Sequence, residues 1–194
     1  MPGPALNRAP GQGFYGKLPA RGDFVRHGLP RGFVAPWDAW LRAVLLAGRE
    51  RLDERWHAAW MEAPVWRFAL AAGVCGPQAA LGLWLPSVDR AGRHFPLTLA
   101  RLGASLADLA EAGGAFLATA ERAGCAAIAD DAPPEALAAA LAEPGDAAGL
   151  PALPQAGTLW WTEGAPLRSA AMLALPGLPD PAAFAGMLDE SCAP

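Results

Sequence analysis

Apolar residues recur along the chain at two different spacings, which together predict the order strands, helix, three strands, helices, strands, helix. The first helix is predicted to begin at Pro36, which suits the first helical position, with Asp38 favourably placed in the first turn. Trp56 and Trp60, four residues apart, predict a second helical piece. The apolar face of the first helix consists of Trp37, Trp40, Leu41, Val44, Leu45 and Leu52. An aromatic stripe of this kind is typical of a core.

A long uncharged segment in the first half of the chain is better explained by strands than by a membrane helix. Residues 68–88 carry no charge and are long enough to span a bilayer, but Gly73, Gly76 and Pro77 interrupt their middle. Two strands joined by a turn account for this pattern, and a third strand follows. The predicted strands cover residues 65–72, 79–85 and 95–102. Because their links are too short for helical crossovers, we expect antiparallel neighbours.

The rest of the chain completes an α/β pattern. Ser105 and Asp108 resemble a capping box, and the helix that they open is predicted to end at Gly124. Residues 1–12, rich in Pro, Gly and Ala, are predicted to form a loose tail, which leaves 13–194 as the domain. Further strands are expected at 13–19, 21–25, 157–161 and 168–175, and further helices at 134–142 and 181–190. These elements predict a mixed, largely antiparallel sheet with helices packed on it.

Composition and charge exclude some classes of protein. The chain has 194 residues, of which 53% are hydrophobic and 18% charged, which excludes a wholly disordered protein and suits one domain. Residues 1–101 hold 13 basic and 7 acidic side chains, residues 102–194 hold 2 and 12, and the formal net charge is −4. This balance argues against a nucleic-acid-binding protein. The N-terminus lacks an apolar signal segment, so we expect neither secretion nor membrane insertion.

No cofactor site is predicted. The three cysteines are widely spaced and form no ligand cluster with histidine, so a structural metal is not expected. Gly13 and Gly16 before Lys17 are too close together for a nucleotide phosphate loop, which needs four residues between its glycines. His27 and His57 are isolated in sequence.

The densest polar segment, residues 86–96, allows two interpretations. Ser87, Asp89 and His94 invite a Ser-His-Asp interpretation, that is, a small hydrolase or phosphotransfer enzyme, but all three lie in one loop and no Gly-x-Ser-x-Gly turn is present. The structural interpretation has Ser87 and Asp89 bonding loop amides. Arg90 and Arg93 can then pair with carboxylates, and Asp23 is a candidate partner for them.

Three sequence blocks together resemble the TagF family of type VI secretion-associated proteins. The blocks are GFYGKLPARGDFV at 13–25, PVWRF at 64–68 and PSVDRAGRHFPLT at 86–98, with Pro36-Trp37-Asp38 and Trp160-Trp161 in order around them. The resemblance covers residues 13–190. It implies a three-layer α/β/α sandwich and a cytoplasmic, non-enzymatic protein that represses the secretion machine after translation. It also implies a forkhead-associated scaffold protein as a binding partner. Ala91 stands where we expect Val in this family.

Because of this resemblance, and because the sequence shows no credible set of catalytic residues, we favour a regulator that binds a scaffold or assembly component. Two polar motifs are expected to converge in a candidate patch that serves either a partner or the fold itself. It consists of Gly16, Lys17, Gly22, Asp23, Ser87, Asp89, Arg90 and Arg93.

Overall fold

A seven-stranded sheet forms the centre of the computed structural model, which describes residues 11–146 and 148–193. The strands are β1 (Gly11–Gly16), β2 (Val25–His27), β3 (Trp66–Leu70), β4 (Ala79–Leu85), β5 (Leu97–Gly103), β6 (Thr158–Thr162) and β7 (Ala171–Leu175). Their order across the sheet is β2-β1-β5-β4-β3-β6-β7. Most of the predicted N-terminal tail lies outside the described residues, but Gly11 and Gln12 belong to β1 rather than to a tail.

The presence of both helices and strands confirms the α/β class. Every strand pairing among the described residues is antiparallel, so the prediction of a mixed sheet is wrong. The links from β3 to β4 and from β4 to β5 are short and join neighbours, as expected. The long helical connections run from β2 to β3 and from β5 to β6. Because neither pair is adjacent in the sheet, these crossovers place no parallel strands side by side.

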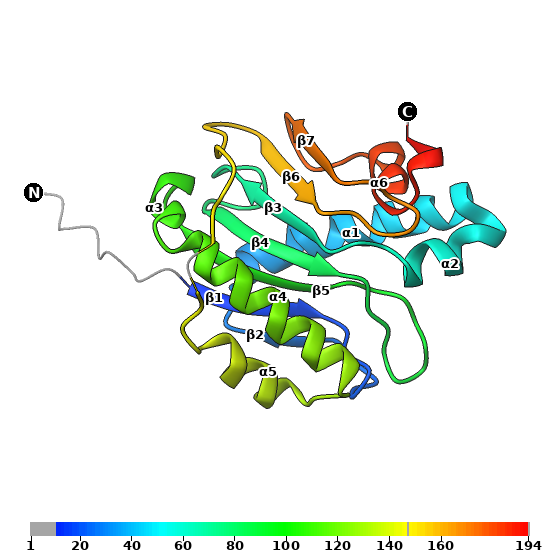
Figure 1. The fold of residues 1–194 in the computed structure, drawn as a ribbon, viewed down its shortest axis with the longest axis horizontal. Helices are drawn as coiled ribbons and strands as arrows, with labels where there is room; N and C mark the ends of the chain where they lie inside the picture. The colour runs from blue at the N-terminus through cyan, green and yellow to red at the C-terminus, as the bar shows by residue number, and fades with distance from the viewer. Residues whose placement is uncertain (1–10, 147, 194) are drawn as a thin grey trace, which may run out of the picture.

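Helices cover both faces of the sheet (Figure 1). They are α1 (Arg31–Leu52), α2 (Trp56–Met61), α3 (Leu106–Ala110), α4 (Gly113–Ala129), α5 (Pro134–Leu141) and α6 (Pro181–Leu188), with 3₁₀ turns at Asp53–Arg55 and Glu190–Cys192. Alternate strand residues point to opposite faces, which creates two separate cores. One lies under α1, α2 and α6, and the other lies under α3, α4 and α5. None of the described helices is apolar over a length that would cross a membrane.

The face under α1 is rich in tryptophan. Trp37, Trp60 and Trp66 are fully buried there, which confirms that the aromatic stripe is core. Trp37 lies 4.7 Å from Trp40 and 6.1 Å from Trp160, measured between ring centroids. Their indole N–H groups find internal acceptors: Trp37 donates to Thr98, Trp40 to the Pro179 carbonyl, Trp66 to the Met187 carbonyl and Trp160 to Thr158. Hydrogen bonds therefore fix the orientation of large rings that apolar packing alone leaves less specified.

Several helix boundaries differ from the prediction. The first helix begins at Arg31, so Pro36 lies inside it rather than at its start. Phe33 and Val34 are buried one turn before Trp37, and their packing extends the same apolar face towards the N-terminus. The capping interaction at Ser105 is confirmed, since its hydroxyl accepts from the Asp108 amide, but the helix that it opens is short and α4 follows separately.

Gly124 does not end α4, which continues to Ala129. A Cβ atom at Gly124 would lie 2.8 Å from Leu85 and 3.1 Å from Leu99, so the glycine lets the helix approach β4 and β5 closely. The missing side chain serves packing between layers, a role that local sequence patterns do not separate from helix termination.

Candidate functional site

Two polar loops meet at one end of the sheet. The loop after β1 contains Lys17–Phe24, and the loop between β4 and β5 contains Pro86–Pro96. The Arg90 amide donates to the Arg21 carbonyl at 3.0 Å, and the Arg90 guanidinium donates to the Ala20 carbonyl at 2.5 Å. The predicted convergence of the two motifs is therefore present in the fold.

Asp89 is the centre of this meeting point, and we call its surroundings the Asp89 cluster, formed by Lys17, Ser87, Asp89 and Arg93. The Lys17 ammonium donates to Asp89 Oδ2 at 2.8 Å, and Arg93 Nε donates to the same oxygen at 2.6 Å. The other oxygen, Oδ1, accepts the amides of Ala91 and Arg93, both at 2.9 Å. The Asp89 side chain has no exposed surface. Every carboxylate oxygen is thus satisfied inside the protein.

These contacts set the charge of the carboxyl group. Burial alone raises the pKa of Asp89, but the hydrogen bonds from Lys17, Arg93 and Ala91 outweigh burial and hold the pKa well below its usual range. Asp89 is therefore ionised at neutral pH, as a buried ion pair with Lys17. Removing one member of such a pair would leave an uncompensated buried charge, so we expect the loss of either partner to destabilise the fold.

Gly16 and Ser87 bring the backbones of the two loops together. Gly16 has a φ of 145°, and a Cβ atom there would lie 2.0 Å from the Pro96 carbonyl oxygen. The Ser87 hydroxyl donates to the Lys17 carbonyl at 2.8 Å, and the Ser87 carbonyl accepts from the Trp60 indole at 3.1 Å. The serine hydroxyl is thus engaged with the neighbouring loop.

The Ser-His-Asp interpretation is not supported by the geometry. His94 Nδ1 accepts a hydrogen bond from the Trp56 indole at 2.8 Å. Burial lowers the pKa of His94, and the charges of Arg49 and His57 lower it further. Among the hydrogen bonds of residues 11–146 and 148–193, none joins His94 to Ser87 or to Asp89. A hydroxyl nucleophile requires a hydrogen-bonded base, and the described residues do not assemble one here.

The candidate patch divides into a buried and an exposed part. Gly16, Lys17, Ser87 and Asp89 are buried, whereas Gly22, Asp23, Arg90 and Arg93 are exposed. The expected pairing of Asp23 with Arg90 or Arg93 is wrong. Arg93 binds Asp89 and the Gly22 carbonyl instead, and Arg90 binds the Ala20 carbonyl.

A groove of about 760 Å³, which we call the basic groove, opens beside the Asp89 cluster. Residues that line it include Lys17, Phe24, Arg42, Leu46, Arg49, Asp53, Trp56, Arg93 and His94. The Arg42 guanidinium lies 5.4 Å from the Phe24 ring centroid, and that of Arg49 lies 5.4 Å from the Trp56 ring. The groove combines cations with aromatic and aliphatic surface. Sequence reasoning did not find it, because its walls come from α1, from Asp53 and Trp56 beyond that helix, and from two loops far apart in the chain.

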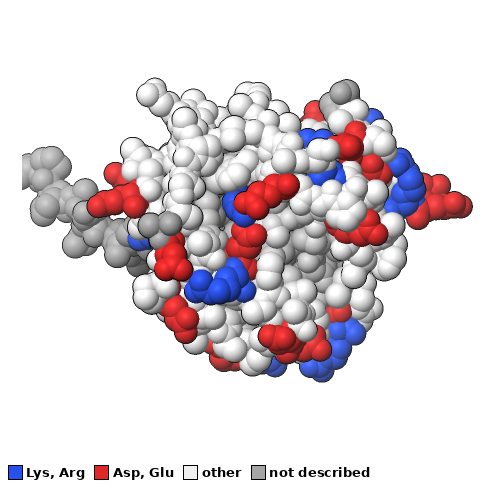
Figure 2. Space-filling model, in the orientation of Figure 1, with Lys and Arg blue, Asp and Glu red and all other residues white. Residues whose placement is uncertain are grey.

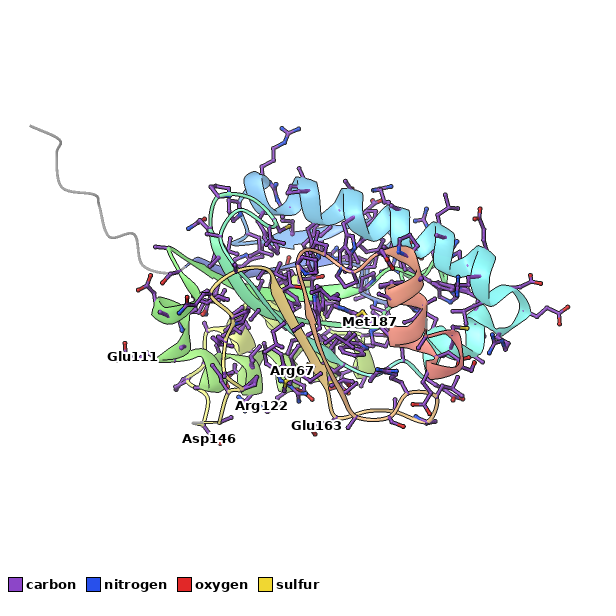
Figure 3. The ribbon with its side chains drawn as sticks, turned by 90° about the horizontal axis from the view of Figure 1, so that it is seen from above. Arg67, Glu111, Arg122, Asp146, Glu163 and Met187 are labelled. Atoms are coloured by element: carbon purple, nitrogen blue, oxygen red, sulfur yellow. The ribbon has the colours of Figure 1, made fainter. Side chains whose placement is uncertain are left out.

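A second charged cluster lies on another part of the molecule. Arg67 on β3 donates to Glu121 on α4 at 2.5 Å and to Glu163 after β6 at 3.2 Å (Figure 3). On the face viewed in Figure 2, some acidic and basic side chains lie together, as near the centre, while others towards the left margin are acidic alone. The Arg67 pairs therefore neutralise only part of the charge on this face. Within the described residues, no group of His, Cys, Asp or Glu side chains could hold a metal ion.

The fold and the site define an antiparallel α/β protein whose polar loops are satisfied internally beside an open groove of cations and apolar side chains. The family model of the TagF N-terminal domain, described as type VI secretion system-associated, matches residues 13–143. The chain belongs to the TagF family.

A solved structure supports this assignment over most of the chain. The crystal structure of PA0076 from Pseudomonas aeruginosa PAO1 is similar, with 34% sequence identity and a TM-score of 0.80. The match covers 92% of this chain and 94% of that one. No curated protein sequence matches the chain.

Proposed function

We propose that this chain is a non-enzymatic negative regulator of a type VI secretion system. It acts after translation, in the cytoplasm, by binding a forkhead-associated scaffold protein or another component needed for assembly. Membership of the TagF family supplies the link to the secretion system. The basic groove carries the proposal for contact, because it leaves charged and apolar groups available on the surface.

Unlike the side chain of Asp89, several side chains of the basic groove are exposed and can contact a partner. Phe24 is 40% exposed and Leu46 is 63% exposed, so both add accessible apolar surface to the groove. Arg42 uses only its Nε to bind Asp38 in the described part of the chain, which leaves its terminal nitrogens for other acceptors. Exposed arginine and aromatic side chains are the residue types that protein interfaces favour.

The hydrogen bonds of the polar loops are compatible with a protein that binds a partner without catalysing a reaction. Ser87, Asp89 and His94 each form hydrogen bonds to other groups of the protein, as described above. A regulator that works by contact needs a rigid surface, and the ion pair under the groove holds Lys17 and Arg93 in place. Arg90 and Gly22, at the exposed rim of the same loops, extend the proposed contact surface.

The proposal is tested in a strain that carries the secretion cluster and lacks this gene. The deletion is expected to raise export of a secreted substrate, and the wild-type gene is expected to lower it again. A variant with Leu46→Asp and Arg49→Glu should fail to restore repression, because it reverses charge and removes apolar surface in the groove. Purified scaffold protein should bind the wild type and not this variant in a pull-down.

Arg51→Glu is the matched control. Arg51 is exposed on the same helix, but two residues beyond Arg49 and therefore about 200° around the helix axis. The control variant is expected to repress and bind as the wild type does. Unchanged export on deletion would refute the regulatory function, and full repression by the groove variant would refute the groove as the contact surface.

A further inference from the structure

The two edges of the sheet are protected to different extents. β2, at one edge, is three residues long and carries Arg26 and His27. β7, at the other edge, has five residues, Ala-Met-Leu-Ala-Leu, with no charge and no proline. Natural edge strands are normally blunted by short length, charge, proline or a bulge, because their open backbone groups pair readily with another strand. Within its five residues β7 shows none of these devices, and a proline, Pro176, follows directly after them.

The outer side of β7 is open. Figure 1 shows β7 at the upper limit of the sheet, with no strand or helix beyond it. Met172 is 58% exposed, and Ala174 is exposed as well. Leu173 and Leu175 are only partly buried against the tryptophan-rich core. The strand therefore leaves apolar side chains and backbone in contact with water.

The pairing with β6 fixes which backbone groups face outward. Leu175 lies opposite Thr158, and the Thr158 hydroxyl donates to the Leu175 carbonyl at 3.5 Å, so that carbonyl points towards β6. Because successive residues of a strand point their N–H and C=O groups to opposite sides, those of Met172 and Ala174 point away from β6. No backbone hydrogen bond of the described residues engages these outward groups.

We propose that β7 is a dimer interface, at which β7 of a second copy of this chain pairs antiparallel across a two-fold axis at Leu173. In this register Met172 of each copy lies opposite Ala174 of the other, and each of these residues donates one hydrogen bond and accepts one. Registers centred on Met172 or Ala174 engage fewer outward groups within the strand. The backbone alone therefore selects the axis.

The side chains agree with the same axis. Met172 meets Ala174 on one face of the sheet, and Ala171 meets Leu175 on the other, so that in these two pairs a large side chain faces a small one. Leu173 meets its own copy on the axis. Since the strand carries no charge, no like charges oppose each other, and the contact is isologous and closes at two copies. The proposed dimer is separate from the proposed repression.

The association state of the purified chain tests the proposal. Sedimentation over micromolar to millimolar concentrations should show a reversible monomer–dimer equilibrium. Met172→Lys places a charge on the edge, and Ala174→Pro removes an outward N–H without touching the bonds to β6. Each is expected to weaken dimerisation by roughly tenfold or more. Met61→Lys is the matched control, because Met61 on α2 is 55% exposed. This control should dimerise as the wild type does.

A cross-link tests the register. Leu173→Cys, in a Cys125→Ser background that removes the exposed native thiol, should form an intermolecular disulfide on mild oxidation. Non-hydrogen-bonded antiparallel pairs bring opposite side chains closest, and the axis places residue 173 in such a pair. A chain that stays monomeric at millimolar concentration overturns the proposal. A dimer that tolerates both edge variants, or that resists cross-linking at residue 173, overturns it too. None of these measurements involves a secretion component, so a failed dimer is distinguishable from failed repression.

Discussion

The Asp89 cluster and the basic groove are neighbours built from similar residue types, but the fold uses their polar groups to different extents. Both carboxylate oxygens of Asp89 accept hydrogen bonds inside the protein, from Lys17, Arg93 and loop amides. Arg49, by contrast, is exposed on the groove wall and has no ion pair among the described residues. In this region the carboxylate of a dense polar motif is satisfied inside the protein, while Arg49 beside it stays accessible.

The largest expected effect follows from removing the buried carboxylate. Asp89→Ala leaves Lys17 charged and buried without its partner, which should lower the free energy of unfolding by about 3–5 kcal/mol. Urea denaturation followed by circular dichroism measures the change. Asp89→Asn keeps an oxygen for the loop amides and should lose less. Wild-type stability in Asp89→Ala would mean that the cluster does not support the fold.

Alanine substitutions at two glycines compare the cost of a steric clash with the cost of a strained backbone conformation. Gly16→Ala should cost about 1–3 kcal/mol from backbone strain, and more because its Cβ would meet the Pro96 carbonyl at 2.0 Å. Gly92 also has a positive φ, 75°, but nothing lies within 4 Å of a Cβ atom there. Gly92→Ala should therefore cost about 1–2 kcal/mol, from the left-handed conformation alone. Equal losses of unfolding free energy in the two variants would contradict the close approach at Gly16.

Acid should weaken the Asp89 cluster selectively. The folded state lowers the pKa of Asp89 below its unfolded value, so its stabilisation is complete above the unfolded pKa of about 4. It is lost progressively as the pH falls from there towards the folded-state pKa. The stability difference between wild type and Asp89→Asn, measured in urea from pH 6 to pH 2, should shrink over this range. A constant difference would show that the ionised form is not the one that stabilises the fold.

The smallest effect on stability is expected in the groove. Arg49→Glu removes an exposed cation lying over Trp56 and should change the unfolding free energy by about 1 kcal/mol or less. The same variant should raise the pKa of His94, because the positive charge of Arg49 helps to lower it. NMR titration of the histidine protons measures this shift. A large loss of stability would place Arg49 with the structural residues instead.

Local patterns predicted most of the elements, because each depends on a short stretch of chain. The uncharged segment is the pair β3 and β4, and Pro134 opens α5 as expected. The sheet order was not predictable, because it depends on pairings between strands far apart in sequence. The start of α1 before Pro36 was missed, since tertiary packing of Phe33 and Val34 overrides the preference of proline for the first turn.

The candidate site, like the order of the strands, depends on contacts between residues far apart in sequence. The convergence of the two polar motifs was expected, but the partner of Asp89 was not. Lys17 reaches Asp89 across 72 residues because β1 pairs with β5 and brings both loops to one end of the sheet. Asp23, in the other polar motif, was a candidate partner for the loop arginines. Instead Arg90 binds the Ala20 carbonyl, and Arg93 binds the Gly22 carbonyl and the Asp89 carboxylate.

The tryptophans packed under α1 give the protein an internal optical probe. Trp56 and Trp60 stack at 5.4 Å, and Trp40 lies 5.6 Å from Trp160, so neighbouring indoles couple electronically. Folded protein should show strong near-ultraviolet circular dichroism and emission at short wavelength. When the helical layer detaches from the sheet, the dichroism should be lost and the emission should move to longer wavelength, so folding can be followed without any added label.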